Sequence, residues 1–484
     1  MTKRTARSDK SSGLSTKKSL RAIVLCSAVA GVGGMPVAHA DTLSQLQSEI
    51  NDLSAQLNQV KAAQGQMKKA EELHPTQQAQ SDDMAGQFVS KGAIPGSFKL
   101  PGSNTSMHIG GFINFQGIYD PKVNLGPKFG IGNLMPEGTA SQQSRRTFHF
   151  QDKVSRLIVG TSTPSPYGDV TTNFALDFYG FTSGGDNNQA LGNNSWGARI
   201  VNAYGTIGGF LVGMTTSNFI DDPDALDSFD NAGAAGLPSG RQPQIRYTMP
   251  LNAGGALSFA IENPQSAYED TQGNIAVVTK TNPLPDLTAK YERSGDWGHY
   301  QLSAVARELG LTDRNGVRTT KLTAAAIVGA TFNLPKAGGG YGRDNGGFQT
   351  WYGAMGRYIP DDFGANIVSA IAVADGTSAN PTGATSVQLQ PDAGGTVFAQ
   401  HWWTPELRSN IGLGINHQRL ASFLPADAQN AVTTKTVHVN LIMRPIPSVD
   451  LGVEVMWGQK TYQDGTGIKP QSADRIEVGG KWHF

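Results

Sequence analysis

The sequence predicts an all-β protein, a 16-stranded antiparallel transmembrane β-barrel, with one short helical segment near the N-terminus. Long stretches alternate apolar and polar residues, a period of two that is typical of strands whose faces meet different surroundings. Glycine is abundant, with 59 residues, and no run approaches the roughly 20 apolar residues that a membrane-spanning helix needs. Such a chain can cross a membrane only as a closed barrel.

The first 40 residues have the features of a secretory signal peptide. A basic start precedes the apolar stretch AIVLCSAVAGVGGM and an A-x-A cleavage site at residues 38–40, so we expect the mature chain to begin near Asp41. Cys26, the only cysteine, lies in the removed part. Removing seven basic and one acidic residue from a balance of 39 and 39 leaves a net charge of −6. A nucleic-acid partner is therefore not expected.

A heptad pattern follows in residues 41–62. The spacing of three and four residues places an apolar seam on one face of a helix, and the rest of the helix is polar, so we expect a coiled coil that joins copies of the chain. The alternative is an amphipathic helix packed on the barrel or lying on a surface. Residues 63–96 lose the periodicity and are predicted to form a linker. The expected oligomerisation residues are Leu43, Leu46, Ile50, Leu53, Leu57 and Val60.

The barrel is expected to occupy residues 97–484. Alternating runs are separated there by Gly, Pro, Asn and Asp, and they give an even number of strands, as bacterial barrels have. The predicted strands are 106–120, 145–163, 169–180, 196–206, 208–219, 241–250, 255–263, 285–294, 298–309, 320–333, 347–358, 396–403, 407–419, 434–444, 448–460 and 474–484.

Long and short connections alternate between these strands. The tight ones include PSPYG, LNAGG, GDW, TPE and PIP, whereas the other set is mostly long, with a glycine-rich exception at 334–346. Outer-membrane barrels have long loops outside the cell and short turns in the periplasm, so both termini and the coil should be periplasmic. The last strand ends with Trp482 and Phe484 on its apolar face, as expected for an aromatic girdle. Sixteen strands leave room for an aqueous channel.

Several segments resemble the DcaP-like outer-membrane porins, a family linked to dicarboxylate uptake. They are GSFKLPGSNTSMHIGGFINFQGIYD (96–120), STPSPYGDVTTNFALDFYG (162–180), GRQPQIRYTMP (240–250) and HWWTPELRSNIGLGINHQR (401–419). The resemblance implies a homotrimer of barrels, each with its own pore and a third external loop folded inward. It also implies that Phe484 belongs to a signal read by the barrel-assembly machinery. The family's basic strand RLRHAYG is RIVNAYG here, starting at Arg199, with one arginine fewer, and its GQ is Gly213-Met214.

Because side chains alternate between the two faces of a strand, eight basic and six acidic side chains should point into the lumen. Arg241 begins the strand that leaves the third loop. Arg241, Arg246 and Arg307 are expected to form a basic wall that attracts anions and faces the acidic loop residues Asp221, Asp222 and Asp224. The alternative is a salt-bridge network that stiffens the barrel, so anion preference depends more on the resemblance than on this count. The inward set is Arg156, Arg246, Lys290, Arg307, Arg408, Arg444, Arg475, Lys481, Asp177, Asp286, Glu292, Asp450, Glu454 and Glu477.

The sequence contains none of the common catalytic motifs, and no cofactor or metal is expected. The acidic stretch DDPDALDSFD (221–230) lacks the glycine and final glutamate of an EF-hand loop, so a solvated loop is preferred to a cation site. We therefore expect a passive porin for small anionic solutes, dicarboxylates among them, in the outer-membrane lipid of a Gram-negative bacterium. A barrel that only anchors a periplasmic partner of the coil is the alternative, and an outer-membrane enzyme is a third reading.

Overall fold

The structure is a computed structural model that describes residues 47–48, 51–59, 61, 89–136, 146–180, 196–222, 225–230, 232–265, 268–270, 279–281, 283–312, 318–336, 339–359, 370–374, 385–420, 430–464 and 467–484. The chain divides into two compact units, residues 1–86 and 87–484.

In the first unit the described residues, 47–48, 51–59 and 61, are helical, as the heptad pattern predicts. Leu53 and Leu57 are exposed in the single chain, whereas Leu43, Leu46, Ile50 and Val60 lie outside the described residues. None of the described helices is long and apolar enough to span a membrane.

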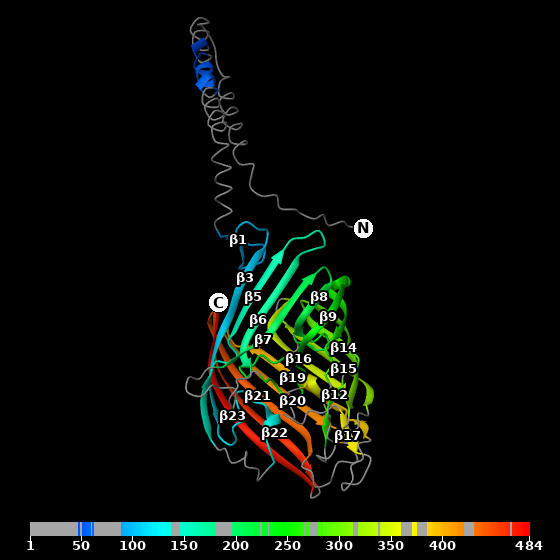
Figure 1. Ribbon diagram of the computed structural model, residues 1–484. Helices are drawn as coiled ribbons and strands as arrows, with labels where there is room; N and C mark the ends of the chain where they lie inside the picture. The colour runs from blue at the N-terminus through cyan, green and yellow to red at the C-terminus, as the bar shows by residue number, and fades with distance from the viewer. Residues whose placement is uncertain are drawn as a thin grey trace. The chain divides into compact units, whose positions relative to one another are not determined.

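The second unit is a β-barrel (Figure 1). Its large sheet contains a small N-terminal pair, β1 (Ser90–Lys91) and β2 (Phe98–Lys99), and one short loop strand, β12 (Thr279–Thr281). The spanning strands are β3 (Ser106–Asp120), β4 (Thr147–Gln151), β5 (Arg156–Thr163), β6 (Val170–Gly180), β7 (Gly197–Ile207), β8 (Phe210–Thr216), β9 (Arg241–Pro250), β10 (Gly255–Glu262), β13 (Asp286–Gly295), β14 (Gly298–Thr312), β15 (Arg318–Pro335), β16 (Tyr341–Gly353), β19 (Asp392–Trp402), β20 (Leu407–Gln418), β21 (Asn430–Ile446), β22 (Val449–Asp464) and β23 (Gly467–His483).

The barrel closes between its last and first spanning strands. β23 pairs antiparallel with β3, and Gly111 and Phe484 exchange two backbone hydrogen bonds of 3.1 Å, so the final residue takes part in the closure. β4 and β5 both pair with β3, so they are two segments of one spanning strand. Within the described residues this makes sixteen antiparallel spanning strands, the number that the sequence predicts.

The predicted facing of the strands is confirmed. On β21 the outward Val439, Leu441 and Met443 are exposed, whereas the inward His438 and Asn440 are buried. Exposed apolar side chains outside and buried polar ones inside reverse the pattern of a soluble sandwich, because lipid surrounds this surface.

Several predicted strands have other bounds in the structure: β16 begins at Tyr341 rather than 347 and β23 at Gly467 rather than 474, and two predicted strands are interrupted or end early. The strand expected at 145–163 is interrupted at 152–155, where Ser155 Oγ accepts a 3.0 Å hydrogen bond from the backbone N–H of Asn114. The strand expected at 347–358 ends at Gly353, whose φ of +138° favours glycine. The chain then forms the 3₁₀ turn η5 (Gly356–Tyr358). These departures place loop residues against the inner wall.

A separate three-stranded sheet joins parts of two other long loops. It contains β11 (Tyr268–Asp270), β17 (Ala370–Ala374) and β18 (Thr385–Leu389), with β11 parallel to β17. The remaining 3₁₀ turns are η1 (Ile131–Asn133) and η4 (Asn252–Gly254).

Candidate solute pathway in the barrel lumen

The third long loop, residues 217–240, starts on the inner wall formed by β10, β13 and β14. Ser217 Oγ donates a 2.6 Å hydrogen bond to Glu262 on β10. Ser303 Oγ on β14 donates a 2.6 Å hydrogen bond to the carbonyl of Phe219. The beginning of the loop is therefore attached inside the barrel, as the family resemblance implies.

The same loop then lies against the opposite part of the wall, on β20, β21 and β22. Asp227 accepts a 2.7 Å hydrogen bond from Arg408 Nε. The backbone N–H of Phe229 donates to Glu454 at 2.6 Å, and that of Ala235 to Thr436 Oγ1 at 2.7 Å. The loop therefore crosses the lumen and divides it.

Glycines on the inner face make room for this contact. A Cβ atom at Gly414 would lie 2.0 Å from the carbonyl oxygen of Ala235, and one at Gly452 would lie 2.3 Å from the ring of Phe229. A larger residue at either position would therefore push the loop away from the wall.

The first long loop, residues 121–146, also folds inward in its described part, which the sequence does not predict. Phe129 and Ile131 pack over Gly458 on β22, where an added Cβ would lie 2.7 Å from Ile131. Both belong to a buried apolar cluster with Leu125, Leu134 and Met456. Apolar residues in a loop expected to be external are the signal that could have indicated this packing.

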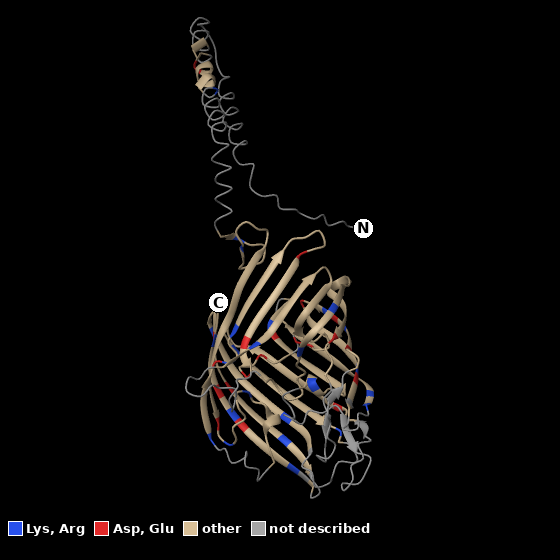
Figure 2. Cartoon of the chain, viewed as in Figure 1, with Lys and Arg blue, Asp and Glu red and all other residues tan. Residues whose placement is uncertain are grey.

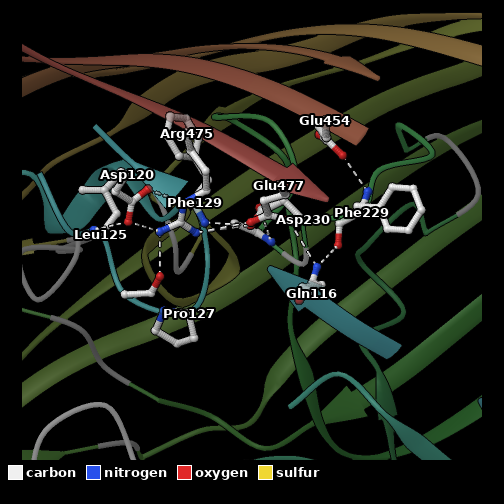
Figure 3. Close-up of polar contacts among 12 residues, drawn as sticks. Gln116, Asp120, Leu125, Pro127, Phe129, Phe229, Asp230, Glu454, Arg475 and Glu477 are labelled. Carbon is white, nitrogen blue, oxygen red and sulfur yellow. Dashed lines mark hydrogen bonds and ion pairs between the residues drawn. The ribbon is translucent and has the colours of Figure 1, made fainter. Parts of the chain in front are cut away.

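Arg475 on β23 connects the first loop to the barrel wall (Figure 3). Its guanidinium donates to both carboxylate oxygens of Asp120, at 2.7 and 2.8 Å, and to the carbonyl of Gly126 at 2.6 Å. Glu477 lies 3.4 Å from Nη1 of the same guanidinium. The side chain is fully buried, so Arg475 is a structural brace rather than a residue of the open lumen.

Asp230 joins the third loop to the same cluster. One carboxylate oxygen accepts a 2.7 Å hydrogen bond from the backbone N–H of Phe129 and lies 3.9 Å from Arg475. Burial raises the pKa of Asp230 above its ordinary value, although the positive charge of Arg475 opposes the shift. The two inward loops therefore share one buried polar cluster.

Arg307 does not lie where the sequence analysis expects it. Its side chain is fully buried and lies 3.4 Å from Asp286. Its guanidinium also donates to the carbonyls of Ala354 and Met355. The early end of β16 brings these carbonyls onto β14, so Arg307 braces the inner wall instead of facing solute.

Arg246 and Lys290 lie in a different part of the wall. Arg246 faces inward as parity predicts, since its neighbours Ile245 and Tyr247 are exposed outside, and its charge interacts with Glu262 and Glu292. Lys290 Nζ forms a 2.8 Å ion pair with Glu292. Because Arg307 is buried, the expected basic wall of Arg241, Arg246 and Arg307 does not form one exposed surface.

The acidic residues of the third loop are divided as well. Asp221 is buried and lies 3.3 Å from His299, whereas Asp222 is exposed and accepts a hydrogen bond from Thr216 Oγ1. Asp224 lies outside the described residues. Among the described residues no group of three His, Cys, Asp or Glu side chains is arranged to hold a metal ion.

Arg241 is close enough to Arg156 and Arg199 for their charges to act on it. The charges of both arginines, together with those of Asp177 and Asp222, act on its guanidinium. Arg199 holds Asp177 through two hydrogen bonds of 2.9 and 2.6 Å, and Arg156 lies 3.9 Å from the same carboxylate. These arginines come from β5, β7 and β9, and we call Arg156, Arg199 and Arg241 the arginine cluster.

Arg156 and Arg199 remain partly exposed on the inner face of the barrel, whereas Arg241, at the start of β9, has the strand parity of the outward Ile245. The side chains of Arg156 and Arg199 are 21% and 35% exposed, and Arg241 is exposed, whereas Asp177 is fully buried. Two carboxylates accompany three guanidinium groups, so positive charge predominates. Figure 2 shows basic and acidic positions mixed along the strands, so this excess is local.

Phe112, which the sequence analysis missed, extends this surface along β3. Its ring lies 5.7 Å from the guanidinium carbon of Arg156 and 5.3 Å from Lys481 Nζ. Both distances are within the range of a cation–π contact. Phe112 therefore connects the arginine cluster to Lys481 on β23.

A closed sixteen-stranded barrel with an apolar outer surface, a polar lumen and an inward third loop defines the protein as an outer-membrane porin, a channel of the Gram-negative outer membrane. The DcaP outer membrane protein family matches residues 40–339. The chain belongs to that family.

The chain is similar to curated porins and to a solved outer-membrane channel. It is 23% identical over 263 residues to porin Omp2a of Brucella ovis, a match of 54% of this chain and 72% of that protein. It is also 23% identical over 272 residues to porin Omp2b of Brucella suis, covering 53% and 68%. The crystal structure of the outer membrane channel DcaP of Acinetobacter baumannii has 20% identity and a TM-score of 0.63, covering 80% of this chain and 99% of that one.

Proposed function

We propose that this porin passes small hydrophilic anions passively, dicarboxylates among them. Arg156 and Arg199 carry the proposal, because their guanidinium groups are partly exposed on the inner face while Asp177, the carboxylate between them, is fully buried. Guanidinium groups match the two oxygens of a carboxylate, and a basic surface in a narrow passage raises the local concentration of anions. A dicarboxylate carries two groups of this kind, so the same positive surface should attract it more strongly than a monocarboxylate.

Replacing Arg156, Arg199 and Arg241 together with glutamine tests this proposal. Loss of three positive charges leaves Asp177 and Asp222 unbalanced, so the reversal potential in a salt gradient should shift toward cation preference. The shift should be larger at 0.05 M than at 1 M salt, because the screening length falls from more than ~10 Å to ~3 Å.

The matched control is Lys91→Gln with Arg318→Gln, which removes two positive charges from exposed positions on β1 and β15, away from the arginine cluster. Its reversal potential should stay close to that of the unchanged protein. An unchanged potential in the triple variant at low salt would assign the arginine cluster a bracing role and refute the proposal.

We also propose that the chain forms a homotrimer to which a periplasmic coil of residues 41–62 contributes. Residues 1–40 are proposed to be a signal peptide and 63–96 a linker. The exposed Leu53 and Leu57 support the coil, because in a single chain these apolar side chains have solvent around them.

Replacing Leu53 and Leu57 with aspartate should lower the temperature at which the oligomer dissociates, since an unpaired carboxylate in an apolar seam costs several kcal/mol. The barrel has its own closure and should still fold. Native electrophoresis over a temperature series measures the temperature at which the oligomer dissociates. Ala55→Asp with Asn58→Asp adds the same charge outside the seam and should have little effect; equal loss in both variants would contradict the coil.

A further inference from the structure

A groove of about 490 Å³ lies on the outward face of the barrel across β16, β19, β20, β21 and β22. Its lining is mainly apolar and includes Phe348, Val397, Leu413, Val437 and Trp457. These five residues pair with one another across neighbouring strands, so they form one continuous row. The lumen site described above uses none of them.

The groove exists because the neighbouring row of outward residues has a glycine, Gly395, in place of a larger side chain. Gly395 pairs with Thr350 on one side and Ile415 on the other, and Ala393 stands in the row after it. A Cβ atom at Gly395 would lie 2.3 Å from the carbonyl oxygen of Gln349, so the strands approach closely there. The small residues leave a depression between larger neighbours.

Basic groups lie at the long-loop end of this depression. Lys435 lines the groove as the partner of Ile415, His417 follows on the same face of β20, and Arg419 comes just after that strand ends. All three residues are exposed, and Lys435 and His417 have the strand parity of the outward Ile415. Within the described residues no carboxylate lies at ion-pair distance from Lys435, although a lysine on the lipid face of a barrel is unfavourable away from the membrane surface.

We propose that this groove binds a lipid of the outer leaflet, with an acyl chain along the apolar rows and an anionic phosphate headgroup against Lys435, His417 and Arg419. The long-loop end of an outer-membrane barrel faces the cell exterior, which sets the leaflet. A phosphorylated lipid supplies an apolar chain and a negative charge together, and it matches both halves of the site. A second copy of the chain would instead have to present an acidic group next to an apolar ridge.

Trp457 provides a probe inside the groove. The purified protein in a mild zwitterionic detergent is titrated with phosphatidylglycerol or phosphatidylcholine, each carrying brominated acyl chains that quench tryptophan fluorescence on contact. The signal of Trp457 is the difference between the protein and its Trp457→Phe variant. We expect half-maximal quenching at a mole fraction of phosphatidylglycerol at least five times lower than that of phosphatidylcholine.

Lys435→Gln should remove most of this preference, and Thr350→Phe should weaken quenching by both lipids because its ring fills the groove. Lys469→Gln, which removes an exposed lysine from β23, is the matched control and should change neither curve. Equal titrations by the two lipids, or an unchanged preference in Lys435→Gln, would overturn the proposal. A Trp457 that neither lipid quenches would also overturn it and would point to a second copy as the occupant.

Discussion

Replacing Arg475 with methionine is expected to destabilise the barrel by about 3–5 kcal/mol, the cost of leaving buried carboxylates without their partner. The guanidinium satisfies both oxygens of Asp120, lies beside Glu477 and also holds the carbonyl of Gly126 in the first loop. The side chain is fully buried, so its partners would lose these bonds inside the protein rather than at its surface. Loss of the folded band in an electrophoretic temperature series measures the effect.

Arg318→Met, at an exposed position where β15 begins, is the control and should change stability by less than about 0.5 kcal/mol. A second replacement, Asp120→Leu, should recover part of the loss in Arg475→Met, because it removes one of the unpaired carboxylates. If Arg475→Met were as stable as Arg318→Met, the polar cluster in Figure 3 would not hold the first loop.

Replacing Glu454 with leucine is expected to release the middle of the third loop. This carboxylate accepts hydrogen bonds from the backbone N–H of Phe229, from Ser228 Oγ and from His438 Nδ1. Leaving such buried donors unpaired costs roughly 1–3 kcal/mol each, so the loop should leave the wall part of the time. Single-channel records should show several-fold more current noise and closure at a lower voltage.

Glu292→Leu is the matched control, because Glu292 forms an ion pair with Lys290 on its own strand. Among the described residues Glu292 forms no hydrogen bond or ion pair with the third loop. Steady currents in Glu454→Leu, equal to those of Glu292→Leu, would show that other contacts hold the loop by themselves.

Much of the barrel could be predicted because its two surfaces impose a local rule. Lipid outside and water or polar side chains inside give each strand its own period of two, so β21 and β22 can be assigned without knowledge of their neighbours. The end of β16 could not be assigned in this way. The residues after Gly353 keep an apolar character, but Tyr358 and Ile359 pack inward against Phe219 of a distant loop.

The lumen was harder to predict for the same reason. Parity says that Arg307 and Arg475 point inward, and both do, but it does not say which inward side chains a loop will cover. The arginine cluster depends on the arrangement of three strands around the barrel, which decides that Arg241 meets Arg156 and Arg199 rather than Arg246. Which side chains of different strands come together is set by the closed barrel and cannot be deduced from the sequence of any single strand.

The most direct test of the anion channel is the reversal potential of the unchanged protein in a planar bilayer with a tenfold gradient of potassium chloride. The arginine cluster predicts a potential of the sign that chloride permeation gives, and this potential should decrease as the mean salt concentration rises, since the guanidinium charges are then screened. A potential of the opposite sign would contradict the anion preference. A bilayer that stays silent after insertion of the folded protein would contradict the open channel itself.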